Sequence, residues 1–303
     1  MNAPSAPGGL PAPVRGVLWM VVSAVCFSAM TASIRPASAD MHPLQVLFFR
    51  NLIGLTLMMP WILKSGIGAM RSKRLPLHVL YASLVYLSMS TWYYAIKKVT
   101  LVDAVALSFT IPFFTTGMAA LFLGERVRWR RWLAIATGFA GALLILRPGF
   151  STIDPNMVLI LFNILGWAAA VIMIKVLNRV DSTNAIVSYM FILLTPISLP
   201  AAIDNWSDPT WTSIPWILLL GLAGWGGHVC ATRAVSLAPT SIVMPIEFIR
   251  LPLLGLIGFL AFGEVPDHWT LIGSAVIVAA ALYVGHREAR VEAERAGGGA
   301  ART

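Results

Sequence analysis

The chain has 303 residues, of which 58% are hydrophobic and only 12% are charged. A soluble protein of this length cannot bury so many apolar side chains, so we expect lipid to be its solvent. The formal net charge of +9 would favour a nucleic-acid partner in a soluble protein. Here the basic residues stand at the ends of apolar segments, where they set membrane orientation, so we expect no nucleic-acid partner.

Apolar segments recur along the chain when hydropathy is averaged over a window of ~19 residues. Each segment is close to the ~20 residues that a helix needs to cross ~30 Å of hydrocarbon. Backbone polar groups in lipid must be paired within the segment, which favours helices over the short alternating strands of a barrel. The sequence therefore predicts an all-α integral membrane protein with ten transmembrane helices, at residues 16–35, 44–64, 76–96, 101–123, 131–148, 157–177, 183–203, 214–236, 241–262 and 269–286.

The two ends of the chain are expected to be disordered tails. Residues 1–15 are rich in Pro, Ala and Gly, and residues 287–303 follow the last apolar segment. The stretch Ala37-Ser38-Ala39 resembles a signal-peptidase site. Because the segment 16–35 is long enough to span and its pattern recurs later in the chain, we expect it to be retained as a helix.

Lysine and arginine gather at one set of segment ends. Assigning the ends alternately to two sides leaves only Arg35, Lys97, Lys98 and Arg147 on the poorer side. The positive-inside rule then places both termini in the cytoplasm, in a multi-pass protein of a bacterial inner membrane. The richer side holds Arg15, Lys64, Arg71, Lys73, Arg74, Arg126, Arg128, Arg130, Arg131, Lys175, Arg179, Arg233, Arg287, Arg290, Arg295 and Arg302.

The first five segments resemble the second five at a nearly constant offset. An odd number of crossings in each copy forces the second copy to lie upside down relative to the first, an arrangement typical of secondary transporters with a site between the repeats. We therefore expect two inverted five-helix repeats, at 16–148 and 157–286. The matches are Phe27, Ala29, Ile34 and Arg35 with Trp167, Ala169, Ile174 and Lys175; Phe49 and Pro60 with Tyr189 and Pro200; Ala95, Lys97, Val99 and Leu101 with Ala231, Arg233, Val235 and Leu237; and 122–125 with 261–264.

These halves resemble the two copies of the EamA-type unit in the drug/metabolite transporter superfamily. The resemblance covers residues 16–286 and rests on Phe48-Phe49-Arg50-Asn51, on the crossovers 95–101 and 231–237, and on the Phe-Gly-Glu-like endings of the fourth and ninth segments. It implies ten helices in two inverted bundles around a central cavity for a small solute. It does not identify the cargo, although the chain is most similar to bacterial carriers of amino acids and metabolites.

One pair of ionisable residues stands out inside a predicted span. Glu247 and Arg250 lie three residues apart on one helix face, between Pro245 and Pro252, which loosen the helix. Ionisable groups in spans are costly and mark functional sites by default. We expect Arg250 to bind a carboxylate and Glu247 to bind an ammonium group or a proton. A structural ion pair within the helix is the alternative.

Polar and aromatic residues on other spans complete the candidate substrate site. The functional interpretation is a cavity wall, and the alternative is that the large side chains fill gaps between helices. The histidine is interpreted either as a proton shuttle or as a buried neutral ring bonded to a carbonyl. These candidate residues are Tyr86, Ser90, Asn163, Trp167, Trp225 and His228.

Other residues are interpreted as structural. Arg50 enters its span early from the outer side, so we expect it to reach outward or to bind a lipid phosphate. Glu125 and Glu264 follow glycines at segment ends and are expected to stabilise the start of the next helix. Cys26 and Cys230 are expected to be small buried hydrophobes.

We expect a carrier of small metabolites that works by alternating access, with amino-acid export as the preferred interpretation. Uptake of riboflavin, S-adenosylmethionine or a similar metabolite is the alternative, because aromatic side chains also suit flat rings. A different class is an intramembrane enzyme with Glu247 and His228 as acid and base, and a third is a channel or scaffold.

The sequence lacks the signatures of hydrolases, nucleotide-binding loops and paired-cysteine metal sites. We therefore expect no catalytic residue, cofactor or metal. Transport must then be downhill or coupled to an ion gradient, and coupling to protons stays open. A monomer or a weak homodimer is expected in the bilayer.

Overall fold

The computed structural model describes residues 12–65, 72, 74–123, 129–146, 154–177, 180–181, 183–237, 244–280 and 282–283. Residues 1–11 and 284–303, most of the two predicted tails, lie outside this part. Within it the regular elements are helices: α1 (Ala12–Ala37), α2 (Pro43–Ser65), α3 (Leu75–Ala95), α4 (Leu101–Ser108), α5 (Ile111–Leu123), α6 (Trp129–Leu146), α7 (Pro155–Leu177), α8 (Thr183–Asp204), α9 (Ile214–Leu237), the 3₁₀ helix η2 (Met244–Ile249), α11 (Arg250–Phe262) and a last helix at His268–Ala280.

Each predicted span overlaps one of these helices or a pair of them. By length and composition, six helical segments of the described residues can cross a membrane. The all-helical prediction is therefore confirmed, whereas the count of ten crossings stays a prediction, since it also needs α3, α6, η2 with α11 and the last helix. The six segments are Val14–Ala37, Pro43–Lys64, Leu101–Phe122, Pro155–Ile174, Ala185–Asp204 and Ile214–Ala231.

Two predicted spans are broken helices. The span 101–123 divides into α4 and α5, and the span 241–262 divides into η2 and α11. Pro112 and Pro252 lie in the first turns of α5 and α11, where a proline is tolerated but cannot bond to the preceding turn. The two breaks meet, because the rings of Phe109 and Phe248 pack edge to face with centroids 4.7 Å apart.

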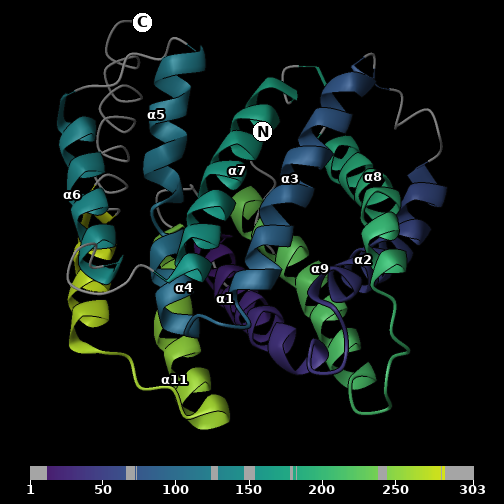
Figure 1. Cartoon of the computed structure of the whole chain (residues 1–303). Coiled ribbons are helices and arrows are strands. Elements are labelled where there is room, and N and C mark those ends of the chain that lie inside the picture. Colours follow the sequence, from purple (N-terminus) through teal and green to yellow (C-terminus); the bar gives the residue numbers. More distant parts are fainter. Residues whose placement is uncertain are drawn as a thin grey trace, which may run out of the picture.

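When each helix is replaced by its counterpart in the other half, the same packed pairs of helices result. Helix α1 lies along α9 and α3 lies along α7, while α2 packs on α8 (Figure 1). Helix α5 packs on α7, and α11 packs on α1. Because α1 would correspond to α7 and α3 to α9, this pattern is the one expected of two similar halves. The inverted orientation of the halves stays a prediction.

Glycines on α9 allow α1 and α2 to approach closely. A Cβ atom on Gly227 would lie 2.9 Å from the ring of Phe27, and one on Gly221 would lie 2.5 Å from Ile53. The hydroxyl of Ser23 donates a hydrogen bond of 3.0 Å to the carbonyl oxygen of Gly227. Small residues make such contacts feasible in a membrane, where helices associate by packing and hydrogen bonding.

The expectation that Glu264 stabilises the start of the following helix is wrong. Its carboxylate instead accepts a hydrogen bond of 3.0 Å from the backbone N–H of Leu101, at the start of α4. The electrostatic principle holds, because a carboxylate still meets the positive end of a helix. The helix concerned, however, lies in the other half of the chain. Glu125 lies outside the described residues.

We expect Gly227→Ala to lower the thermal midpoint of the detergent-solubilised protein by the equivalent of about 1–3 kcal/mol, because the new methyl group displaces the ring of Phe27. Gly226→Ala is the matched control, since its Cβ would meet only Cys26 Sγ at 3.7 Å. Both changes gain the same helix propensity, so the difference between them isolates the steric clash. Equal midpoints would contradict the tight α1–α9 contact.

Candidate functional site

The predicted pair of ionisable residues lies at the second helix break. Glu247 belongs to η2, and Arg250 is the first residue of α11, a helix whose N-terminus has no side-chain cap. Arg250 Nη1 donates to Glu247 Oε2 over 3.4 Å. Both side chains are largely buried, with exposed fractions of 18% and 22%. The pair therefore forms as the spacing predicts, at a point where the backbone is irregular.

Arg50 on α2 is buried, with an exposed fraction of 2%. Its Nη1 donates to Asn51 Oδ1 at 3.1 Å and to Met89 Sδ at 3.6 Å, and its Nη2 lies 3.4 Å from His228 Nε2. The expectation that Arg50 reaches outward to lipid is wrong. In the part of the chain that the structure describes, no carboxylate forms an ion pair with it.

The glycine face of α9 explains how the guanidinium fits inside. A Cβ atom on Gly224 would lie 3.3 Å from Arg50 Nε, so the missing side chain provides the room that Arg50 occupies. On the other side, Arg50 Cζ lies 5.8 Å from the ring centre of Phe191 on α8. Contacts of this kind stabilise a cation weakly and do not replace a counter-ion.

His228 and Phe27 connect Arg50 with Arg250. The ring of Phe27 meets His228 edge to face at 5.1 Å, and Arg250 Cζ lies 5.4 Å from the centre of the same phenyl ring. The charges of Arg50 and Arg250 both act on His228. Helices α2, α9, η2 and α11 thus bring two arginines, one histidine and one glutamate together, with Phe27 of α1 between them. We call Arg50, His228, Glu247 and Arg250 the charged cluster.

Two buried donors, one in the charged cluster and one on α9, have no acceptor among the described residues. Within the described residues, Trp225 Nε1 and Arg250 Nε make no hydrogen bond. An unsatisfied buried donor costs about 1–3 kcal/mol, which a ligand oxygen would offset. The charged cluster therefore offers several donors and a single carboxylate, a composition suited to a solute with an anionic group, and the place of Trp225 in the site stays a prediction.

The remaining candidates lie on α3 and α7. Asn163 Nδ2 donates to the carbonyl oxygen of Ser88 at 2.9 Å, and Ser88 Oγ donates to the carbonyl oxygen of Asn163 at 2.8 Å. Ser90 Oγ donates to the carbonyl oxygen of Tyr86 within α3 at 2.7 Å. Trp167 packs with Tyr86 against the apolar core between α3, α7 and α8. The bonds of Asn163 with Ser88 join α3 to α7, and none of these hydrogen bonds reaches the charged cluster, so the role of all four residues in binding stays a prediction.

A separate polar group links the segment before α3 with the segment between α7 and α8. Asp181 Oδ2 accepts from Ser72 Oγ at 2.6 Å and lies 2.9 Å from His78 Nε2. Desolvation raises the pKa of Asp181, but hydrogen bonds from Ser72 and His78 and the charges of His78 and Arg74 hold it below its usual value. This group ties two distant parts of the chain together and is not part of the site.

Arg50 and Phe27 are the residues that sequence reasoning missed. Both lie in segments that carry the internal repeat or the family resemblance, but an arginine near the end of a span also fits a position at the lipid headgroups. The default assumption that an ionisable residue in a span is functional would have found Arg50. Nothing in the sequence distinguishes Phe27 from an ordinary apolar residue of α1.

The apolar helices, the two interrupted spans that meet and the buried charges beside the interruption are features typical of membrane carriers. The model of the EamA-like transporter family matches residues 14–147 and again residues 155–285. The chain belongs to this family, and it is a multi-pass membrane protein that transports small metabolites.

Curated relatives cover nearly the whole chain. An S-adenosylmethionine uptake transporter of Rickettsia bellii is 26% identical over 280 residues, which are 92% of this chain and 96% of that protein. A riboflavin transporter of Rhizobium johnstonii is 31% identical over 92% of this chain and 93% of its own length. A pseudopaline exporter of Pseudomonas aeruginosa is 32% identical, with coverages of 88% and 94%. These names do not specifically support the expected export of amino acids.

A solved crystal structure shares the fold. It superposes with a TM-score of 0.61 at 17% sequence identity and covers 89% of this chain and 95% of its own. At this identity the likeness concerns the arrangement of helices alone.

We expect Arg50→Met to leave the protein folded and to raise its thermal midpoint, because the change removes a desolvated cation that no carboxylate of the described residues neutralises. The gain should correspond to about 1 kcal/mol or more, since methionine fills a similar space. Arg35→Met is the matched control and should lower the midpoint, because the guanidinium of Arg35 is bonded to Glu264 and to two carbonyl oxygens. Thermal denaturation in detergent measures both. A midpoint for Arg50→Met far below wild type would assign Arg50 a purely structural role.

Proposed function

We propose that this protein takes up a carboxylate-bearing metabolite of the S-adenosylmethionine type by alternating access. The observation that carries the proposal is the buried position of Arg50, which no carboxylate of the described residues neutralises, close to His228 and the Glu247–Arg250 pair. The names of the Rickettsia relatives support the choice of solute.

The chemistry of the charged cluster matches an α-amino-acid group. A guanidinium binds a carboxylate through two parallel hydrogen bonds, and Arg50 and Arg250 supply two such groups. Glu247 can pair with an ammonium group once a carboxylate has taken over one arginine. Phe27 and Trp225 offer aromatic faces to a further cationic centre, such as a sulfonium. Free amino acids and S-adenosylmethionine share the first two features, and only the latter has the third.

A solute anion would also link binding to the motion of the carrier. Without it, closing the site around Arg50 leaves a cation in a dry interior, which costs several kcal/mol. A bound carboxylate offsets this cost, so the loaded site closes more readily than the empty one. In this proposal the halves 16–148 and 157–286 move against each other around the breaks in the fourth and ninth spans. Both termini lie in the cytoplasm, in a bacterial inner membrane.

Riboflavin uptake is the second candidate. The Rhizobium relative and a riboflavin transporter of Vibrio cholerae, 30% identical over 90% of this chain and 93% of its own length, favour it. Trp225 and Trp167 would suit a flat ring by stacking. Riboflavin carries no carboxylate, so it leaves Arg50 without an anion, and we rank it second for that reason. Coupling to protons and the oligomeric state stay predictions.

We expect proteoliposomes with the wild-type protein to show saturable counterflow of labelled S-adenosylmethionine, and Arg250→Ala to reduce it by about 10- to 100-fold. The loss corresponds to one hydrogen bond between charged groups, about 1.5–3 kcal/mol. Lys98→Ala is the matched control, because it removes an exposed cation outside the site and should transport normally. Labelled riboflavin and methionine are assayed in parallel.

Three results would count against this proposal. Counterflow of riboflavin without counterflow of S-adenosylmethionine would select the second candidate. Wild-type rates in Arg250→Ala would exclude Arg250 from the site. Flux that does not saturate with any of the three solutes would indicate a channel.

A further inference from the structure

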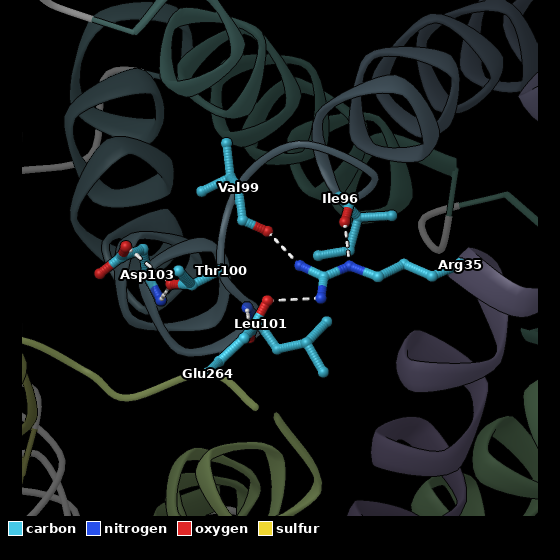
Figure 2. Close-up of polar contacts among 7 residues, drawn as sticks. All are labelled: Arg35, Ile96, Val99, Thr100, Leu101, Asp103 and Glu264. Carbon is cyan, nitrogen blue, oxygen red and sulfur yellow. Dashed lines mark hydrogen bonds and ion pairs between the residues drawn. The ribbon is translucent and has the colours of Figure 1, made fainter. Parts of the chain in front are cut away.

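At the end of α1 the guanidinium of Arg35 is bonded through all three of its nitrogen atoms (Figure 2). Nε donates to the carbonyl oxygen of Ile96 at 2.7 Å, and Nη2 donates to the carbonyl oxygen of Val99. Nη1 donates to Glu264 Oε1, which makes an ion pair. One side chain thus holds the crossover between α3 and α4 together with the segment that follows α11.

The second oxygen of Glu264 binds the start of α4. Glu264 Oε2 accepts from the backbone N–H of Leu101 at 3.0 Å, where the helix dipole favours a negative charge. The hydroxyl of Thr100 caps the same helix by accepting from the N–H of Asp103 at 3.2 Å. Glu264 therefore makes two contacts with the first half of the chain: one with Arg35 and one with Leu101.

The end of α11 is shaped to place this carboxylate. Gly263 adopts φ +66°, a left-handed conformation that suits glycine, and ends the helix. The N–H of Glu264 then donates to the carbonyl oxygen of Gly258 at 3.0 Å, which turns the chain back. A Cβ atom on Gly258 would lie only 2.9 Å from Glu264 Oε2, so this glycine gives the side chain its room. The ring of Phe262 lies 4.8 Å from Arg35 Cζ and covers the guanidinium.

The partners come from different halves of the chain. Arg35 and the α3–α4 crossover belong to residues 16–148, whereas Glu264 belongs to residues 157–286. A second contact joins the same halves nearby, because Thr270 Oγ1 donates to Asp103 Oδ1 at 2.5 Å. The side chains of Arg35 and Glu264 are each 15% exposed, so water can replace their contacts when they separate.

We propose that the Arg35–Glu264–Leu101 contact is a latch that holds one face of the carrier closed and is released when that face opens. Alternating access requires the two halves to part on one side at a time. Parting breaks the two contacts of Glu264 and the nearby contact of Thr270 with Asp103, whereas Arg35 keeps the carbonyl oxygens of Ile96 and Val99 within its own half. The basic residues predict that this face is the outer one, since Arg35 and Lys97 lie on the poorer side.

Because opening separates Glu264 from Arg35 and Leu101, the latch can be tested by distance measurement. We expect Glu264→Gln, which keeps an acceptor for Leu101 but loses the ion pair with Arg35, to raise the population of the open outer face about tenfold. Spin labels at positions 39 and 265, two exposed sites beside the latch, report the separation of the halves by pulsed electron paramagnetic resonance. Cys26 and Cys230 are replaced by serine in this background.

Arg35→Gln is the second variant, and it should shift the distances in the same direction. Asp204→Asn is the matched control, because it removes an exposed carboxylate at the end of α8 and should leave the distances unchanged. Wild-type distances in both Glu264→Gln and Arg35→Gln would overturn the latch. A lower thermal midpoint without a shift in distance would also overturn it, since it would make Glu264 a helix cap only. The distance measurement needs no solute, so a negative result would contradict the latch without contradicting the proposed substrate.

Discussion

A guanidinium in the interior of a membrane protein requires acceptors, and Arg50 finds only neutral ones among the described residues: an amide oxygen, a thioether and an imidazole. Taking a cation out of water costs several kcal/mol unless an anion accompanies it. The surrounding structure nevertheless holds the side chain of Arg50 inside, because Gly224 leaves room for it and the ring of Phe191 covers it. The proposed choice of solute follows from this one buried charge.

Arg35, in contrast to Arg50, is an arginine whose guanidinium meets a carboxylate. Its three nitrogen atoms are bonded to two carbonyl oxygens and a carboxylate, and it is partly exposed. Arginine suits both positions because its fork of donors has fixed directions. Where the guanidinium meets a carboxylate the residue joins structural elements, and where it meets only neutral groups it is available to an anionic ligand. In this chain, the distinction separates Arg35, which joins the two halves, from Arg50, a candidate binding group.

The helices and the Glu247–Arg250 pair were predictable because hydropathy and three-residue spacing are local properties. Pro252 also predicted an interrupted span, although not the 3₁₀ turn before it. The inward position of Arg50 was not predictable, since the face of a helix that meets its neighbours depends on the whole packing. Glu264 is a similar case: its partner Leu101 is 163 residues away, and no spacing rule connects them. Asn163 was predicted as a site residue, but its bonds to Ser88 could not be predicted, because they depend on the contact between α3 and α7.

The interruptions of the fourth and ninth spans have a consequence for the surrounding lipid. A continuous helix that tilts changes the thickness of bilayer it matches, and the membrane resists the resulting mismatch. A span made of two pieces, such as α4 with α5 or η2 with α11, can reorient one piece while the other keeps its depth. A protein built in this way can therefore change shape without deforming the membrane, and its turnover should depend only weakly on the acyl-chain length of its host lipids.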